Sequence, residues 1–280
     1  MVVRAPAKLN LCLYLGGRRA DGLHELRSLF CALVLSDRIE IAEARGEVDE
    51  IVCAGVEGPN LVGVALEAMR ARGWQHPPVR VEIEKRIPVA AGLGGGSADA
   101  AAVLRLAGEQ IGDLPAFAAG LGADVPSQLE PGFALVSGAG EVIEPLPAPG
   151  EFGVVLIPDD EGLATGDVYA EADSLGIGRE AAELDQLAEG LRAAAGAGAS
   201  PLDYAELLAN DLEQPAISLR PRIAEALAAL EEVGAVRALV AGSGPTALGL
   251  FDDVDAAERA AAALPPRYAH AFVSTPRRLG

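Results

Sequence analysis

The sequence predicts an α+β protein with two domains, for three reasons. Helical and strand patterns both occur along the 280 residues, but they do not alternate regularly as strand, helix and strand, which argues against a doubly wound parallel sheet. A proline-rich stretch, residues 144–153, contains three prolines that neither a helix nor a strand ladder can run through. A chain of this length allows one large domain or two modest ones. We therefore expect one domain over residues 1–150 and another over residues 151–280.

The charge balance argues against one class of partner. The chain has 22 Lys+Arg against 41 Asp+Glu, a formal net charge of −19, and its cations are scattered along the sequence. A protein this acidic gains little from releasing counterions at a nucleic-acid backbone. We therefore expect no nucleic-acid partner, whereas a small anionic substrate held by local groups is compatible with the charge.

The apolar and cysteine patterns predict a cytoplasmic protein. The first apolar stretch, residues 9–15, is interrupted by Asn10, and no run reaches the roughly 18 apolar residues that a membrane span requires. Cys12, Cys31 and Cys53 are odd in number and far apart, which fits neither a disulfide framework nor a zinc site. We expect a reducing compartment and no membrane partner.

The first predicted element is a strand. Residues 7–15 alternate leucines with Lys8, Asn10 and other side chains, a period of two. Lys8 and Asn10 therefore share one strand face. The polar, glycine-containing segment that follows, residues 16–25, is too long and too charged for a tight hairpin, and we expect a loop there.

A helix and a second strand come next. Residues 60–72 have helical periodicity, with Asn60 as a plausible N-cap and Gly73 just past the end. Residues 79–84 alternate apolar and charged side chains, which predicts a strand with one wet face.

The middle of the chain predicts a glycine-rich turn that leads into a helix. The helix spans residues 97–111, with Ser97 as its N-cap and Asp99 in its first turn. The other elements expected in this half are a short helix after Pro115 and strands near residues 133–136 and 141–143.

The second half begins with a strand at residues 154–157, followed by alanine-rich helices and a low-complexity linker at residues 193–200. The remaining expected elements are a helix at 223–233, two short strands flanking GSGPT, a helix at 254–264 and a last strand at 268–273.

The glycine-rich turn is the strongest local signal for function. Residues 88–101 read PVAAGLGGGSADAA, and their four glycines leave backbone amides uncovered just before a helix N-terminus. Such a concavity attracts phosphate. It is not a Walker A loop, because no Lys follows its last glycine, and it is not a dinucleotide fingerprint. Taken alone, a flexible turn before a helix explains the run equally well.

A second glycine cluster lies at residues 240–251, VAGSGPTALGLF. It matches part of a dinucleotide motif, but Pro245 and the apolar residues on both sides predict a strand, a tight turn and a strand. Its amides are available to a ligand, although a simple hairpin is the favoured interpretation of the cluster by itself.

Three further residues are candidates for chemistry. The chain uses 20 Arg but only two Lys, Lys8 and Lys85, so each lysine stands where a compact ammonium is of use. The alternative for Lys8 is a solvent-exposed position at a strand edge. Asp124 lies in GLGADVP, after a helix-ending glycine and among apolar neighbours, as either a turn former or a semi-buried base.

Together, four segments resemble the motifs of the GHMP kinases, small-molecule kinases that bind ATP without a Walker A loop. They are PAKLNL at residues 6–11, PVAAGLGGGSADAA at 88–101, LGADVP at 121–126 and AGSGPT at 241–246, in the family's order and spacing. Three more segments, GRRADGLHELRSLF at 17–30, KRIP at 85–88 and NDLE at 210–213, resemble one branch of the family. The resemblance extends from Pro6 to about Phe251.

The resemblance implies an architecture and an activity. The implied fold is two α+β domains with the active site in the interdomain cleft. The branch implies ATP-dependent phosphorylation of the 2-hydroxyl of the methylerythritol moiety in its cytidine diphosphate conjugate, a step of non-mevalonate isoprenoid precursor biosynthesis. ATP and Mg²⁺ are the implied cofactors, and the metal ligands are unknown because the ion is implied by the triphosphate alone.

The resemblance also assigns roles to residues. Lys8 and Asp124 match the family's catalytic pair, with Asp124 accepting the proton of the substrate hydroxyl and Lys8 orienting it. The positions that match nucleotide-binding residues are Asn60, Lys85, Pro88, Val89, Ala90, Ala91, Gly92, Leu93, Gly94, Gly95, Gly96, Ser97 and Ala98. The positions that match substrate-binding residues are Asn10, His24, Thr165, Tyr169, Gly242, Ser243 and Gly244, with Thr246 closing the last motif.

The chain departs from the family pattern at a few positions. Leu23 stands where close relatives have Tyr, so one of two rings expected around the cytosine is absent. Ser127 and Gln128 replace residues that are more often aromatic, and Ala164 replaces a common serine. These departures bear on substrate choice and leave kinase chemistry intact.

Two alternatives remain beside this interpretation. One is another GHMP kinase acting on homoserine, mevalonate or a sugar, which would have no need of His24 and Tyr169. The other, from a different class, is a nucleotide-binding protein without catalysis, against which the presence of Lys8 and Asp124 counts.

Overall fold

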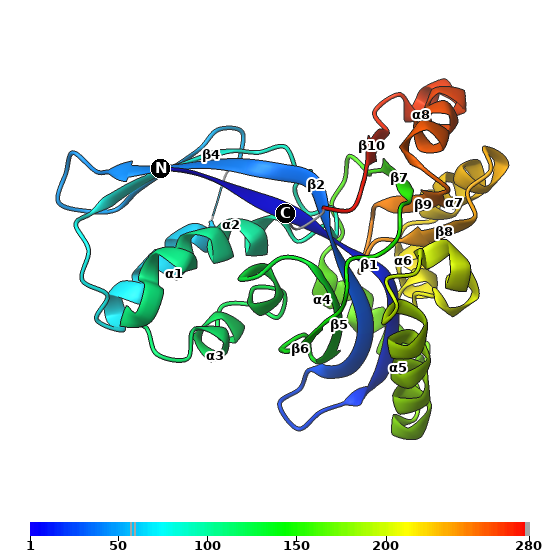
Figure 1. Ribbon diagram of the computed structural model, residues 1–280, viewed down its shortest axis with the longest axis horizontal. Coiled ribbons are helices and arrows are strands. Elements are labelled where there is room, and N and C mark those ends of the chain that lie inside the picture. The colour runs from blue at the N-terminus through cyan, green and yellow to red at the C-terminus, as the bar shows by residue number, and fades with distance from the viewer. Residues whose placement is uncertain (57, 59, 278–280) are drawn as a thin grey trace. The chain divides into compact units, whose positions relative to one another are not determined.

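The computed structural model describes residues 1–56, 58 and 60–277. The chain forms two compact units, which we call unit 1 and unit 2. Unit 1 comprises Met1–Lys8, Leu35–Val89 and Gly94–Pro131, and unit 2 comprises Leu9–Val34, Ala90–Leu93 and the described part of Gly132–Gly280. Each unit combines strands with helices, which agrees with the predicted α+β class (Figure 1). Neither unit is contiguous in sequence, and a division at residue 150 stays a prediction.

Two long strands contribute to both units. They are β1 (Val2–Arg18) and β2 (His24–Glu43), which pair with each other. The strand predicted at residues 7–15 is therefore confirmed and is longer than its leucine alternation. Lys8 and Asn10 are both buried in it, so neither is a solvent-exposed side chain at a strand edge.

The sheet of unit 1 carries helices on an apolar face. Its strands β3 (Glu50–Cys53) and β4 (Val79–Glu84) are parallel, and β4 pairs antiparallel with the second half of β2. The alternation predicted for β4 is confirmed, because Val79, Val81 and Ile83 are buried between more exposed charged residues. These residues form one core with α1 (Leu61–Ala71) and α2 (Gly95–Leu104).

Helix α1 begins and ends as the sequence predicts. The Asn60 side chain accepts a hydrogen bond from the Val62 amide at 2.9 Å, which is the N-cap interaction. Gly73 has a φ of +91° just beyond the end, a conformation that glycine adopts without strain. The short helix expected near Pro115 is also present as α3 (Leu114–Ala119), capped by Asp113.

Unit 2 contains a four-stranded antiparallel sheet in the order β10, β7, β9, β8. The strands are β7 (Gly153–Ile157), β8 (Arg237–Val240), β9 (Ala247–Phe251) and β10 (Phe272–Ser274). The helices whose apolar residues share a core with this sheet are α4 (Thr165–Ser174), α6 (Glu213–Leu219), α7 (Arg222–Glu232) and α8 (Val254–Ala263). In the part of the chain that the structure describes, no helix has the length and apolarity that a membrane span needs.

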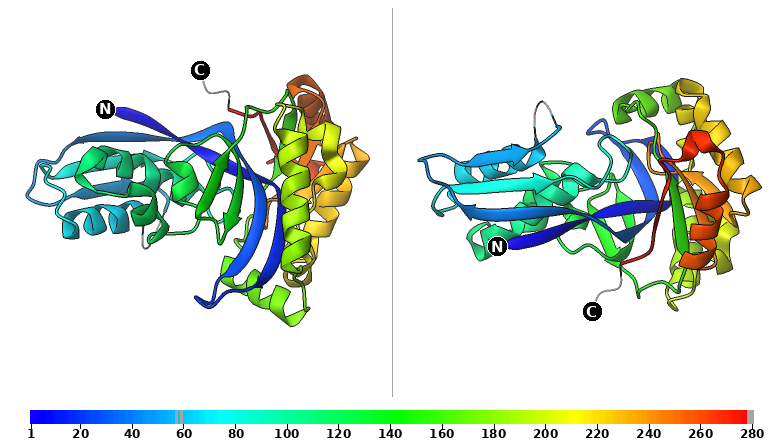
Figure 2. Two further views of the ribbon diagram at one scale, coloured as in Figure 1. Left: turned by 60° about the horizontal axis from the view of Figure 1, so that its bottom comes forward. Right: turned by 90° about the horizontal axis from the view of Figure 1, so that it is seen from above.

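The first half of β2 forms the other sheet region of unit 2. It pairs antiparallel with β5 (Phe133–Gly138), which pairs in turn with β6 (Val142–Pro145). Helix α5 (Ala181–Ala195) lies against this hairpin, as Figure 2 shows. An added Cβ at Gly16 would be 2.5 Å from the Leu184 side chain, so the contact depends on the absence of a side chain there.

The loop predicted at residues 16–25 is wrong in extent. Strand β1 continues to Arg18 and β2 begins at His24, so only residues 19–23 form the turn. The Arg19 amide donates to the Leu23 carbonyl at 2.7 Å, and Gly22 has a φ of +85°. The polar side chains misled the prediction because a strand ladder is made by backbone groups, which pair whatever the side chains are.

The prediction that Ser97 is the N-cap of a helix over residues 97–111 is also wrong. Helix α2 begins at Gly95, and its N-cap is Gly94 with a φ of +67°. The helix ends at Leu104, and residues Arg105–Gln110 continue as a 3₁₀ segment interrupted at Gly108. Glycine reaches the left-handed conformation without cost, so the entry to the helix moves ahead of the polar residue that would ordinarily cap it.

Two smaller boundaries differ in unit 2. Helix α5 extends to Ala195 and takes up the start of the alanine-rich segment expected as a linker. The last strand begins at Phe272, because residues Pro266–Tyr268 form a 3₁₀ turn. The first difference follows from the high helix propensity of alanine, and the second from the fixed φ of proline at a turn.

Candidate active site

Lys8 and Asp124 are brought together in unit 1. The Lys8 Nζ lies 3.0 Å from the Asp124 Oδ2, although the two residues are far apart in sequence. The Lys8 side chain is 7% exposed, whereas that of Asp124 is 32% exposed. The Ser127 hydroxyl donates to the Asp124 backbone carbonyl at 2.8 Å and so fixes the turn that carries this aspartate. The pair therefore has one buried cation and one carboxylate that a solute can reach.

The start of α2 lies directly against the Lys8 side chain. A Cβ placed on Gly94 would be 2.7 Å from the Lys8 Cγ, so this position admits no side chain without moving the lysine. Gly94 is the N-cap of α2 and gives its first amides no side-chain acceptor. The amides in the first turn of a helix have no intrahelical partner and favour an anion. The glycine loop thus places an anion-binding helix start next to the candidate catalytic lysine.

The preceding part of the loop lies against the third motif within unit 2. A Cβ on Gly92 would be 2.2 Å from the Ala241 carbonyl oxygen and 3.0 Å from that of Gly244. Gly92 has a φ of +75°, and Ala90 has a φ of +54°, which is costly for a residue with a side chain. The close approach of two backbones explains why glycine is needed at position 92. The remaining predicted loop residues are divided between the units. Unit 1 contains Pro88, Val89 and residues 94–98, and unit 2 contains Ala91 and Leu93, the neighbours of Gly92.

The third motif is the tight turn that the sequence predicts between two strands. The Gly244 amide donates to the Ala241 carbonyl at 2.8 Å, and the Ala241 amide donates to the Thr246 carbonyl at 2.9 Å. Gly242 and Gly244 have φ values of +58° and +81°. The Thr165 and Ser243 hydroxyl oxygens are 3.0 Å apart, so these two predicted substrate contacts lie together.

Asn210, from the NDLE segment, stabilises this turn through side-chain hydrogen bonds. Its side-chain amide donates to the Val240 carbonyl at 2.8 Å and to the Gly242 carbonyl at 2.7 Å. Its Oδ1 accepts from the Leu212 amide at 2.9 Å. The buried asparagine therefore satisfies backbone groups of the turn, and its contribution is to hold Gly242 in place.

Asn10 and His24 are buried side chains of unit 2 with different partners. The Asn10 amide donates to the Ser28 hydroxyl at 2.9 Å. The His24 Nδ1 lies 3.1 Å from the Gly16 carbonyl, and its Nε2 lies 3.1 Å from the Asp173 Oδ1. The Tyr169 ring is 5.5 Å from the His24 ring, centroid to centroid, so two predicted substrate residues are neighbours.

Lys85 is held by two buried aspartates. Its Nζ contacts Asp37 and lies 2.8 Å from the Asp99 Oδ2. Asp37 also accepts hydrogen bonds from the Arg86 and Ile87 amides. A Cβ on Gly95 would be 3.2 Å from the Lys85 Nζ, which places this cluster under the start of α2.

Asp99 is the most strongly perturbed member of the cluster. Burial, which the Lys85 ammonium offsets only in part, raises the pKa of Asp99 to about 7. Burial lowers the pKa of Lys85, but the two carboxylates outweigh it and the net direction is upward. Among the described residues, the Asp99 Oδ1 has no hydrogen-bond partner. The cluster thus contains two carboxylates for one ammonium.

Sequence reasoning missed four residues that position the candidate site: Asp37, Asp99, Asp173 and Asn210. Asp99 and Asn210 lie inside motifs that the sequence singled out, so their place in those motifs was the available signal. Asp37 and Asp173 carry no local signal, because a buried aspartate and a surface aspartate look alike in sequence.

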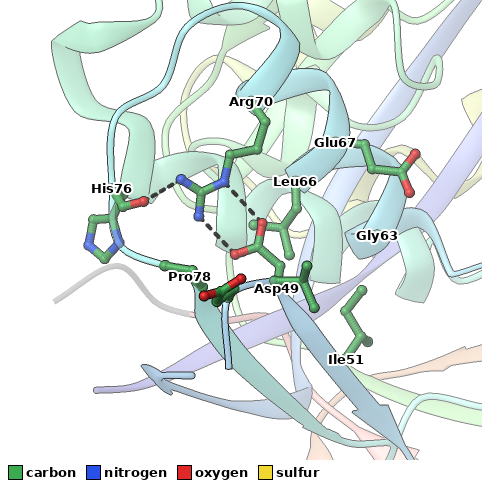
Figure 3. A pocket seen from close by; sticks show the side chains of 10 residues that line it. Asp49, Ile51, Gly63, Leu66, Glu67, Arg70, His76 and Pro78 are labelled. Atoms are coloured by element: carbon green, nitrogen blue, oxygen red, sulfur yellow. Dashed lines mark hydrogen bonds and ion pairs between the residues drawn. The ribbon is translucent and has the colours of Figure 1, made fainter. Parts of the chain in front are cut away.

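A separate pocket of about 620 Å³ lies in unit 1 beside β3 and α1 (Figure 3). Arg70 faces this pocket and donates to both oxygens of Asp49, at 3.0 and 2.8 Å. The same guanidinium donates to the His76 and Pro77 carbonyls. None of the residues lining the pocket is a predicted site residue. The ion pair links the residue before β3 to α1, and the two carbonyl contacts hold the segment before β4 against the same helix.

Two family models match the chain. The GHMP kinases N terminal domain matches residues 60–126, and the GHMP kinases C terminal domain matches residues 187–270. The first match contains Asn60, Lys85, the glycine loop and Asp124, and the second contains the turn with Gly242.

Relatives of known name match most of the chain. It is 40% identical to the 4-diphosphocytidyl-2-C-methyl-D-erythritol kinase of Rhodococcus jostii, over 94% of this chain and 88% of the relative. It is 41% identical to the kinase of the same name from Mycobacterium tuberculosis, over 88% of this chain and 80% of the relative. A crystal structure of 4-(cytidine 5'-diphospho)-2C-methyl-D-erythritol kinase superposes with a TM-score of 0.78 at 36% identity, covering 98% of each chain. The homoserine kinase from Cytophaga hutchinsonii, at 19% identity and a TM-score of 0.70 over 99% of this chain and 93% of that one, shares the fold.

Substituting Gly94 tests the contact between the glycine loop and Lys8. We expect Gly94→Ala to lower the free energy of unfolding by about 1–3 kcal/mol, because alanine is strained at this φ and its Cβ meets the lysine. Gly73→Ala is the matched control, since Gly73 also has a positive φ, +91°, but an added Cβ there meets no atom within 4 Å. Urea unfolding of both variants measures the difference, and equal losses of stability would contradict the contact.

The pH dependence of stability tests the state of Asp99. A carboxyl with a raised pKa in the folded protein contributes stability that is present below pH 4 and lost as the pH rises through 7. Asp99→Asn lacks this loss, so the stability of wild type relative to the variant should fall with rising pH, by up to about 1.4 kcal/mol per pH unit.

The control for this measurement is Asp49→Asn. Burial acts to raise the pKa of Asp49, but hydrogen bonds from Arg70 and the Val79 amide outweigh it and the pKa is lowered, so its titration falls below the same window. Urea unfolding between pH 4 and pH 7 should give parallel curves for wild type and this control. A parallel curve for Asp99→Asn as well would show that Asp99 ionises ordinarily.

Proposed function

Because this chain belongs to the GHMP kinase family, we propose that it transfers the γ-phosphoryl group of ATP to the 2-hydroxyl of 4-diphosphocytidyl-2-C-methyl-D-erythritol, a step of non-mevalonate isoprenoid precursor biosynthesis. Relatives of this name at about 40% identity over most of the chain support the substrate. The observation that carries the chemistry is the 3.0 Å contact between Lys8 and Asp124 beside Gly94.

In this proposal Asp124 is the general base. Its carboxylate accepts the proton of the 2-hydroxyl as that oxygen forms a bond to the γ-phosphorus. The bond from the γ-phosphorus to the β,γ-bridging oxygen breaks, and ADP leaves with the electron pair. Phosphoryl transfer requires little covalent work from the protein, so a positioned base and charge neutralisation account for most of the catalysis.

Lys8 supplies a buried positive charge beside Asp124 in this acidic chain. Its ammonium orients the Asp124 carboxylate and opposes the negative charge that develops on the transferring group. Its burial strengthens this effect, because a low dielectric weakens a charge less than water does. The Gly94 backbone packs against the Lys8 side chain, and a side chain at position 94 would displace the lysine.

The nucleotide side consists of the glycine loop, with Asn60 as a further contact and Lys85 beneath the loop. The uncapped amides at the start of α2 bind phosphate oxygens in this proposal, and the helix dipole favours their negative charge. Asn60 caps α1 through its Oδ1, which leaves its amide hydrogens for a ligand. Lys85 is engaged by Asp37 and Asp99, so its contribution is to fix the base of the loop.

The residues present fit a Mg²⁺ ion that is bound mainly by the phosphate oxygens of ATP. Among the described residues, no three carboxylate, imidazole or thiol groups converge to hold a metal ion. Mg²⁺ prefers oxygen ligands and keeps several waters, so phosphate oxygens plus one or two protein oxygens are sufficient. The Ser97 hydroxyl at the start of α2 is the side-chain oxygen that we assign to it. When bound, the ion neutralises phosphate charge.

The substrate side consists of Asn10, His24, Tyr169, Thr165 and the turn of the third motif. His24 and Tyr169 form an aromatic pair suited to a pyrimidine base, and Leu23, which is 52% exposed, provides an aliphatic neighbour. The Thr165 and Ser243 hydroxyls offer donors to polar groups of the ligand. We place the reaction in the cytoplasm, which the need for ATP and the dispersed cysteines favour.

Steady-state kinetics of two variants test this function. With Mg·ATP and the cytidine substrate, we expect Asp124→Asn and Lys8→Ala to lower kcat by about 10²- to 10⁴-fold, because each removes half of the catalytic pair. Both variants should still show an ATP-dependent rise in Tm, since the glycine loop is unchanged.

The exposed residue Asp252 provides the control, because Asp252→Asn changes an aspartate in the same way on the surface. Homoserine and mevalonate serve as competing acceptors for the wild-type protein. Full activity in Asp124→Asn would remove the mechanism, and phosphorylation of either competing alcohol instead of the cytidine substrate would remove the substrate assignment.

A further inference from the structure

A segment of unit 2 lies against the tip of the glycine loop. It comprises residues 158–163, which connect β7 with α4, and we call it the β7–α4 segment. A Cβ added to Gly162 would be 2.9 Å from the Ala90 Cβ, so this position admits no side chain unless one of the two segments moves. Gly162 and Ala90 both belong to unit 2. The β7–α4 segment is therefore a direct neighbour of the loop.

Ala90 has a conformation that needs support from its surroundings. Its φ of +54° lies in the left-handed region, which is unfavourable for a residue with a side chain. Such a conformation persists only where neighbouring groups hold it, and it occurs often in loops that bind ligands. Gly92 is supported by the turn of the third motif, and the Ala90 side chain packs against Gly162. The tip of the loop thus has a support at each of these two positions.

Ion pairs hold the β7–α4 segment in place. The Asp159 side chain is 11% exposed and contacts the Arg222 guanidinium at the start of α7, and the Arg220 guanidinium lies 3.5 Å from it. Arg220 also pairs with Glu161 at 2.7 Å, and the Glu161 amide donates to the Asp159 Oδ1 at 2.8 Å. Ion pairs near a surface hold a segment firmly when several charges form a network. The network therefore opposes a retreat of the segment from Ala90.

We propose that Asp159 and Gly162 are positioning residues for the nucleotide. Asp159 anchors the β7–α4 segment, and Gly162 lets this segment pack closely enough to hold Ala90 in its left-handed conformation. The backbone after Ala90 leads within a few residues to the start of α2, so a displaced Ala90 turns the amides there away from the phosphate oxygens. The effect is on the binding of ATP, and Lys8 and Asp124 are unchanged. This inference rests on the proposed function, because it takes the glycine loop as the phosphate site.

A double-mutant cycle on ATP binding tests the contact between Gly162 and Ala90. Gly162 lies outside the left-handed region, so alanine there is strained by the contact and not by its φ. We expect Gly162→Ala to raise the Kd for ATP about tenfold, as for a lost hydrogen bond to a charged group. In an Ala90→Gly background the opposing Cβ is absent, so the same substitution should raise the Kd less than about twofold. Gly112→Ala is the control, because an added Cβ there meets no atom within 4 Å, and it should keep the wild-type Kd.

Steady-state kinetics of Asp159→Asn test the anchor. The carboxamide keeps an acceptor for the Glu161 amide but loses the charge that the two arginines face. We expect the KM for ATP to rise about fivefold, whereas the kcat and the KM for the cytidine substrate should change less than about twofold. Asp160→Asn, at an exposed neighbouring position, is the control and should leave all three values as in the wild type.

Three results would overturn the inference. They are an unchanged Kd in Gly162→Ala, an equal rise in Kd with and without the Ala90 Cβ, and a fall in kcat alone in Asp159→Asn. Each of these results is obtained with a wild-type protein that binds ATP and phosphorylates the cytidine substrate. If the wild-type protein does neither, the proposed function itself fails, and the two failures are thereby distinguished.

Discussion

The contact between the Lys8 ammonium and the Asp124 carboxylate is the interaction on which the site depends. The chain carries a formal charge of −19 and only two lysines, and both lysines lie against buried or half-buried aspartates of unit 1. Both ammonium groups are therefore fixed at specific points of unit 1. Lys8 is fixed by its burial in β1, by the ion pair with Asp124 and by the packing of the Gly94 backbone against its side chain.

Two glycines of the glycine loop allow a close approach of neighbouring groups. At Gly94 the neighbour is the lysine side chain, and at Gly92 it is a backbone carbonyl of the third motif. A side chain at either position would separate elements that the chain brings together from distant segments. The glycine loop thus has two functions, because the same bare backbone that allows this contact also leaves amides available to phosphate. Asn210 supports the facing turn through two hydrogen bonds to its carbonyls.

Much of the fold is predictable because its signals are local. Strand β4, the capped helix α1 and the turn between β8 and β9 follow from a period of two, a cap with its glycine, and a glycine–proline turn. The start of α2 was misplaced because the left-handed conformation of Gly94 is set by its surroundings, and a serine two positions into the helix looks like a cap. The turn after β1 was drawn too long because side-chain polarity does not report on backbone pairing.

The site was predictable in part, and for a different reason. The roles of Lys8 and Asp124 came from a resemblance of ordered motifs, and the structure brings the two residues into contact. The partners of Lys85 and His24 were not predictable, since Asp37 and Asp173 reach them through tertiary packing that leaves no periodic trace. A double-mutant cycle on kcat/KM with Lys8→Ala, Asp124→Asn and the double variant tests most directly whether the first pair acts as one catalytic unit. Our account predicts that the double variant is about as slow as the slower single variant, and losses that multiply independently would contradict it.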